Sequence, residues 1–141
     1  MATRSRIGLL EGDKVKSIYC HYDGYPAFVG KVLFEFYKSK ERVEALLSLG
    51  NLSYIAPRIE PLGAHSFSKP EKETCVFYGR DRGETETEAV EHSYEDYVGF
   101  VDNDWTEYHY IYKDGEWYYL HHTDKKEYKL NRLENNLTVD A

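Results

Sequence analysis

The chain has 141 residues and a formal net charge of −7, which exclude two full-sized domains and argue against a nonspecific grip on nucleic-acid phosphates. No stretch approaches the roughly 20 apolar residues of a membrane span, and residues 1–10 lack the apolar core of a signal peptide. We therefore expect one cytoplasmic domain over residues 1–141, with a polar tail that frays from about residue 134. Cys20 and Cys75 should be reduced thiols that pack as small buried hydrophobes.

The first third of the chain predicts a hairpin followed by two helices. Apolar and β-branched residues fill Arg6–Glu11 and Val15–His21, which a short Gly-containing turn separates. Pro26 suits the first turn of a helix, while Ser39 suits the N-cap of a second helix that Gly50 ends. The first helix carries apolar residues at helical spacing at Phe28, Val29, Val32, Leu33 and Phe36, and the second at Val43, Leu46 and Leu47.

The middle of the chain is predicted to be irregular. Residues 51–70 contain three prolines and a glycine, which break regular structure, and long loops of this kind are often functional. A third strand is expected at Glu73–Tyr78. Residues 83–104 then hold acids and no lysine or arginine, with a short helix expected around Tyr94–Phe100. The acids are Glu84, Glu86, Glu88, Glu91, Glu95, Asp96, Asp102 and Asp104. This stretch is interpreted as a solvated face, with an acidic partner-binding surface as the alternative.

The clearest element is a hairpin late in the chain. Trp105–Tyr112 and Glu116–His122 flank Asp114-Gly115, a favoured two-residue turn. This turn predicts cross-strand pairs at Tyr112–Trp117, Tyr110–Tyr119, Tyr108–His121, Ile111–Tyr118, His109–Leu120 and Glu107–His122. A final strand or turn is expected near Tyr128, Leu130 and Leu133. The predicted fold is α+β, a mostly antiparallel sheet of about five strands with a helical pair packed on one face.

A first candidate site follows the second predicted strand, at Cys20 to Asp23. Cys20 and His21 are neighbours on a strand and point to opposite faces, which argues against a nucleophile and base pair. His21 and Asp23 share a face, so with Tyr22 they are candidates for contacting a ligand. The alternative is that Cys20 belongs to the core and Asp23-Gly24 forms a turn.

A second candidate site is Tyr78–Glu84. In an extended segment Arg80 and Arg82 would project to one side, which suits a clamp on a phosphate or carboxylate, with Tyr78 beside it. The equal alternative is an internal network of ion pairs with Asp81 or Glu84. Neither a P-loop nor a dinucleotide fingerprint is present, and no cofactor is predicted.

The aromatic hairpin and its histidines are a third candidate. Its tyrosines and Trp117 could stack on bases, but core packing or a homodimer interface is favoured because the surroundings are not basic. His121 and His122 should face opposite ways on a strand, although Glu107, His109 and Asp124 lie nearby. No Cys-x-x-Cys or His-x-x-x-His spacing occurs, so no metal site is predicted.

Several of these segments together resemble a known family. The start at residues 1–5, the segments Ser17–Pro26 and Tyr78–Glu84, Gly30 and the Tyr-rich hairpin resemble a family of small uncharacterised proteins of tailed phages and bacteria. In that family Trp is usual at the position of Tyr22, and a Gly-x-His-Ser/Asp-Phe stretch corresponds to residues 63–67 here. The resemblance implies an accessory protein made in the host cell cytoplasm and supplies no activity.

Three functions follow from these observations. The leading hypothesis is non-catalytic binding of a small anionic, nucleotide-like ligand, or of a host protein, through His21, Tyr22, Asp23, Tyr78, Arg80 and Arg82. One alternative is a small hydrolase or nucleotide-processing enzyme in which His21 is the general acid/base, oriented by Asp23, and Arg80 stabilises negative charge. The other is an inhibitor that binds a host factor through its acidic run.

Overall fold

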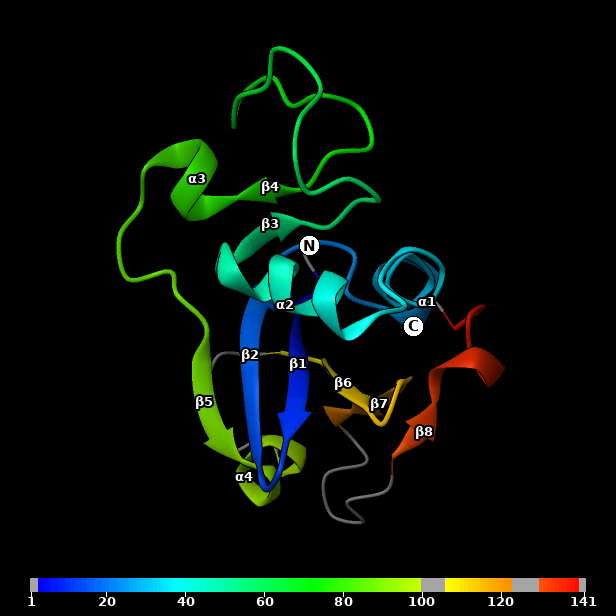
Figure 1. Ribbon diagram of the computed structural model, residues 1–141. Coiled ribbons are helices and arrows are strands. Elements are labelled where there is room, and N and C mark those ends of the chain that lie inside the picture. The colour runs from blue at the N-terminus through cyan, green and yellow to red at the C-terminus, as the bar shows by residue number, and fades with distance from the viewer. Residues whose placement is uncertain (1–2, 100–105, 123–129, 140–141) are drawn as a thin grey trace.

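The computed structural model describes residues 3–99, 106–122 and 130–139. The strands are β1 (Ser5–Glu11), β2 (Lys14–Cys20), β3 (Leu52–Tyr54), β4 (Val76–Phe77), β5 (Val90–Ser93), β6 (Tyr108–Lys113), β7 (Glu116–His121) and β8 (Asn131–Arg132). The helices are the π-helix η1 (Pro26–Gly30), α1 (Lys31–Phe36), α2 (Lys40–Ser48), α3 (Tyr78–Arg82), α4 (Tyr94–Val98) and the 3₁₀ turn η3 (Leu133–Asn135). Figure 1 shows α3 at one end of the molecule and α4 at the other, beside the β1–β2 turn.

The α+β class is confirmed, but the predicted sheet is wrong in its size and direction. Among the described residues the sheet has eight strands in the order β4-β3-β2-β1-β6-β7-β8, and β5 pairs with β2. It is mixed, because β1 pairs with β6 and β2 pairs with β3 in parallel. The sequence pattern missed β3 and β5 because these strands are only 3 and 4 residues long, too short to show an alternation. The expected final strand or turn forms as β8 and η3.

The two hairpins form as predicted. β1 and β2 pair antiparallel from Ser5↔Cys20 to Glu11↔Lys14. β6 and β7 pair in the predicted register, including Tyr112↔Trp117. Asp114 and Gly115 have φ values of 51° and 81°, and positive φ at both positions is the geometry of a turn that matches the strand twist. Trp105, expected in this hairpin, lies outside the described residues.

The helical pair also forms, with one difference on its first helix. The Ser39 side chain accepts a hydrogen bond from the Arg42 N–H at 3.2 Å, so the predicted N-cap of α2 is confirmed. On the first helix Val29 and Leu33 are buried, but Phe28 and Phe36 are 36% and 45% exposed. The predicted stripe assumed one continuous α-helix, whereas residues 26–30 form the π-helical turn η1.

Side chains cover both faces of the hairpin within the chain. Its tyrosines on one face pack with the helices, and their polar atoms bond to main-chain carbonyls. Tyr110 Oη donates to Gly24 O at 2.6 Å, and Trp117 Nε1 donates to Tyr37 O at 2.8 Å. The face offered for base stacking or a homodimer is therefore buried in the protein's own core. The opposite face packs in a second cluster of Val15, Tyr97, Val98, Ile111 and Leu120.

The acidic stretch contains more regular structure than expected. β5 pairs antiparallel with β2, and α4 confirms the short helix expected after Tyr94. Tyr97 from α4 is buried and donates to Tyr110 O at 2.8 Å. Gly8 is required beneath it, because a Cβ there would lie 2.9 Å from the Tyr97 hydroxyl. No helix in the described part of the chain is long and apolar enough to cross a membrane.

Candidate functional site

The two sequence motifs that were candidate sites lie on either side of β3. Tyr22 N donates to Ser53 O at 3.0 Å, and Tyr78 N donates to Asn51 O at 3.1 Å. Burial raises the pKa of the Tyr78 hydroxyl, and the Tyr22 hydroxyl adds to this, while a hydrogen bond with Ser53 opposes it. The structure therefore brings Tyr22 and Tyr78 into one neighbourhood.

His21 and Asp23 are not paired with each other. His21 Nδ1 lies 2.7 Å from the Tyr19 hydroxyl, and its ring meets Tyr22 edge-on at 4.5 Å between centroids. Burial lowers the pKa of His21, and the charge of Arg4 lowers it further. Asp23 has a φ of 57° and accepts the Val29 N–H on its main-chain oxygen at 3.2 Å, so it forms a turn. No hydrogen bond joins the two side chains, which leaves the proposed general acid/base without its orienting partner.

The arginine motif is helical, which corrects the expected extended clamp. In α3 two residues spaced by two point to different sides. Arg80 donates to both Asp81 oxygens, from Nε at 2.9 Å and Nη2 at 3.1 Å, and also to Cys75 O at 3.0 Å. Arg82 instead lies 3.4 Å from Glu84. The geometry matches the internal alternative, and Gly83, with a φ of 77°, ends the helix.

A buried histidine completes this network, and sequence reasoning gave it no role. His65 Nε2 lies 3.2 Å from Asp81 Oδ2, with side chains only 2% and 6% exposed. His65 Nδ1 accepts the Glu71 N–H at 2.9 Å, and Nε2 faces the Asp81 carboxylate. Burial alone would raise the pKa of Asp81, but hydrogen bonds from Arg80, the Phe77 N–H and His65 lower it.

The irregular segment over residues 55–75 is held by this region. The Glu71 carboxylate accepts the Leu62 and Gly63 N–H groups at 2.9 and 2.8 Å and the Thr74 hydroxyl at 2.8 Å. These bonds, led by the one from Leu62, lower the pKa of Glu71. The segment is therefore a loop ordered by its own polar contacts, and Arg80, Asp81 and His65 join it to α3.

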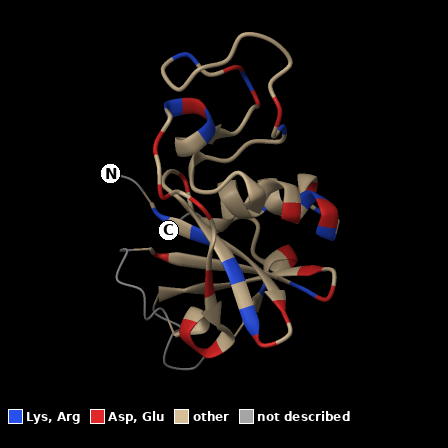
Figure 2. Ribbon diagram, turned by 60° about the vertical axis from the view of Figure 1, so that its left-hand side comes forward, with Lys and Arg blue, Asp and Glu red and all other residues tan. Residues whose placement is uncertain are grey.

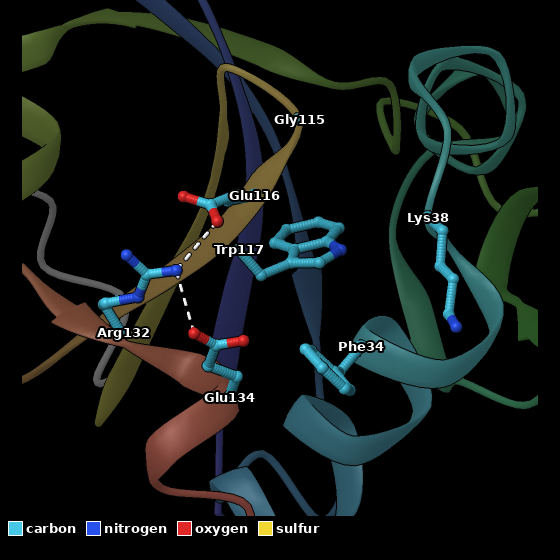
Figure 3. A pocket seen from close by; sticks show the side chains of 7 residues that line it. All are labelled: Phe34, Lys38, Gly115, Glu116, Trp117, Arg132 and Glu134. Carbon is cyan, nitrogen blue, oxygen red and sulfur yellow. Dashed lines mark hydrogen bonds and ion pairs between the residues drawn. The ribbon is translucent and has the colours of Figure 1, made fainter.

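A cleft lies elsewhere, between α1, the hairpin turn and the η3 region (Figure 3). Its volume is about 240 Å³. It is lined by Phe34, Lys38, Gly115, Glu116, Trp117, Arg132 and Glu134. Figure 3 shows the Phe34 and Trp117 rings between Arg132 on one side and Lys38 on the other. The cleft thus has an apolar floor with charged groups at its edge.

Charge within the cleft is unequally compensated. Arg132 Nη2 lies 2.8 Å from Glu116 Oε1 and 2.8 Å from Glu134 Oε1, and the charges of both carboxylates raise the pKa of its guanidinium. Lys38 Nζ, by contrast, forms no ion pair with the residues that the structure describes. Trp117 is held by its bond to Tyr37 O and is 6% exposed. The cleft thus contains the indole of Trp117 in a fixed position and the ammonium of Lys38, which has no ion-pair partner among the described residues.

Sequence reasoning did not find this cleft. Trp117 was assigned to a strand, and Lys38 and Arg132 were given no role. In the structure the Ala27 N–H donates to Val139 O at 2.8 Å, which holds the end of the described chain against η1. That long-range contact holds the segment that borders the cleft, and no local sequence pattern predicts such a contact.

Comparison of the chain with protein-family models, curated proteins and solved structures finds no match. The resemblance to the phage family therefore stays a prediction.

Proposed function

We propose that the protein is a non-catalytic binding protein whose ligand seat is the cleft between α1, the β6–β7 turn and η3. The observation that carries the proposal is the pairing of a fixed aromatic floor, Trp117 and Phe34, with the uncompensated ammonium of Lys38. A rigid indole supplies apolar contact at little entropic cost, and the cation gives the ligand one orientation.

The ligand class follows from the volume and the charge of the cleft. About 240 Å³ is below the usual range for drug-sized ligands, so the ligand is a small molecule or a single side chain of a partner. A phosphate chain would meet the carboxylates of Glu116 and Glu134, which the single positive charge of Arg132 neutralises only in part. A compact aromatic carboxylate fits better than the nucleotide-like ligand expected from Arg80 and Arg82.

Contacts within the two sequence motifs weigh against the hydrolase hypothesis. Arg80 donates four hydrogen bonds to Asp81 and to main-chain carbonyls, which leaves at most one N–H for a substrate. His21 is bonded to Tyr19 and not oriented by Asp23. These contacts support a structural role for Arg80 and His21. They weaken the hypothesis that the two residues are catalytic.

Calorimetric titration with indole-3-acetate and its neutral amide tests the proposal. The carboxylate is expected to bind more tightly than the amide, and Lys38→Gln should remove that difference. Lys40→Gln is the matched control, because Lys40 lies nearby in sequence and is exposed in a pair with Glu11 at 3.6 Å. Equal binding of the two compounds, or an unchanged preference in Lys38→Gln, would contradict the assignment of the cleft.

A second candidate function, docking of a basic host protein, is supported by the acidic surface. Every described acid between residues 84 and 96 is exposed. Figure 2 marks acidic positions in red, α4 among them. An accessory role in a phage-infected cell would suit such a surface. Docking of this kind predicts an affinity that falls steeply with added salt. Salt-independent capture of a host protein would count against it.

A further inference from the structure

The open end of the β6–β7 hairpin gathers three metal-binding side chains. The ligand atoms of Glu107, His121 and His122 all lie within 4.8 Å of one another. We propose that these residues bind a divalent late transition-metal ion, with Zn²⁺ as the ion of reference. This site lies at the opposite end of the hairpin from the turn that lines the cleft, so the inference does not depend on the proposed function.

The backbone explains why two adjacent histidines can act together. Alternation along a strand would send His121 and His122 to opposite faces. β7, however, ends at His121, and the chain turns at His122, whose N–H donates to Glu107 O at 2.7 Å. The two imidazole rings consequently lie 4.2 Å apart between centroids. The strand ends one residue earlier than the predicted Glu116–His122, and this early end brings the two histidines together.

The donor set suits zinc in kind and in number. Two imidazole nitrogens and one carboxylate oxygen are a common protein ligand set that leaves a fourth position for water. Zn–N and Zn–O distances of about 2.0–2.2 Å require ligand atoms closer together than 4.8 Å. Glu107 and His121 are half-buried and His122 is exposed, so side-chain rotation can close the gap without moving the strands.

His109 and the two cysteines are poor metal ligands in the folded chain. His109 lies on the second core, where Nδ1 is 2.7 Å from Tyr97 O and Nε2 is 2.9 Å from the Thr106 hydroxyl. Burial raises the pKa of Cys20 to about 12 and also raises the pKa of Cys75, so neither is a ready thiolate. Metal binding measured on the folded protein should therefore occur at the cluster of Glu107, His121 and His122.

Calorimetric titration of the untagged full chain with ZnCl₂ tests the proposal, and Co²⁺ absorption gives a second readout. We expect one ion per chain and a visible Co²⁺ band typical of four or five ligands. His122→Ala should weaken binding at least tenfold, since loss of residues that merely orient metal ligands already costs roughly 10–100-fold. Glu107→Gln should weaken binding and change the Co²⁺ band. His92→Asn, which removes an imidazole from β5, is the matched control and should bind as the unmodified chain does.

Thermal unfolding separates ligand loss from misfolding. At one Zn²⁺ concentration the metal should raise the Tm of the unmodified chain and of His92→Asn more than it raises the Tm of His122→Ala. Because His122 is exposed, the Tm of His122→Ala without metal should match that of the unmodified chain. Absence of Zn²⁺ binding, or equal binding in His122→Ala, would overturn the assignment.

Discussion

Two arginines of this protein sit between carboxylates in opposite surroundings. Arg80 binds Asp81 at the base of the ordered loop, where the arginine is 21% exposed and the aspartate 6%. Arg132 binds Glu116 and Glu134 at the edge of the cleft, where all three side chains are between 46% and 49% exposed. Arg80, which belongs to a candidate sequence motif, is part of the structural network around the loop. Arg132, from the C-terminal segment, lies at the edge of the candidate ligand site.

The same chemistry has different energetics in the two places. A buried ion pair has lost its hydration, so removal of one partner leaves the other charged and unpaired. An exposed pair keeps water and is screened by salt, so its removal costs little. Substitutions on the two networks should separate a structural role from a functional one.

The largest effect is expected for Asp81→Ala. This change removes the acceptor for Arg80, the Phe77 N–H and His65 at once. We expect a loss of about 3 kcal/mol in the free energy of unfolding, the lower end for a broken buried pair because Arg80 keeps some exposure. Urea denaturation followed by circular dichroism measures it. Asp96→Ala, on the exposed side of α4, is the control. Equal urea midpoints for Asp81→Ala and Asp96→Ala would show that the Asp81 network does not stabilise the fold.

Stability should also depend on pH through Asp81. The folded-state pKa of Asp81 lies below its ordinary value of about 3.9. A lowered folded pKa means that the contribution is complete above the unfolded pKa and is lost as the pH falls through the folded one. The difference in unfolding free energy between the unmodified chain and Asp81→Asn should thus shrink as the pH falls from 7 toward 3. Glu71, whose pKa is also lowered, titrates in both proteins and cancels. A constant difference over that range would show that the charge of Asp81 is not involved.

An intermediate effect is expected for Tyr110→Phe. The Tyr110 hydroxyl is buried and donates to the main-chain oxygen of Gly24, inside the first sequence motif. Its removal leaves that oxygen unsatisfied, at a cost of about 1–3 kcal/mol in unfolding free energy. Tyr118→Phe removes a hydroxyl that bonds the exposed Glu116, and its urea midpoint should stay unchanged. Similar urea midpoints for Tyr110→Phe and Tyr118→Phe would mean that the bond from Tyr110 to the Gly24 oxygen does not stabilise the fold.

Sequence patterns predicted the parts of the fold that are set by local chemistry. The Asp114-Gly115 turn fixed the whole hairpin register, and Ser39 marked the start of α2, because each acts on its own neighbours. Strands β3 and β5 were missed because pairing with β2, and not their own residues, makes them strands. The parallel pairing of β1 with β6 joins residues that are far apart, and no local pattern encodes it.

The candidate sites were harder to predict for the same reason. Spacing of two between Arg80 and Arg82 implies a clamp only in an extended chain, and the segment is a helix. The cleft joins Lys38, Trp117 and Arg132 from three distant segments, and each is an ordinary residue where it stands. The alternative of an internal network was available from Asp81 beside Arg80, but sequence alone could not rank it above the clamp.

The smallest effect on stability is expected for Arg132→Ala. The guanidinium is exposed and its two pairs are screened, so the urea midpoint should not change measurably. Its effect should appear in the cleft, because Glu116 and Glu134 become uncompensated and repel an anionic ligand near Lys38. Indole-3-acetate should then bind more weakly to Arg132→Ala, and added salt should reduce that loss by screening the carboxylates. A large fall in the urea midpoint would place Arg132 with Arg80 as part of the scaffold and remove the contrast between them. An unchanged affinity at low salt would instead place the anion beyond the reach of both glutamates, and Lys38→Gln would then decide whether the cleft holds the carboxylate at all.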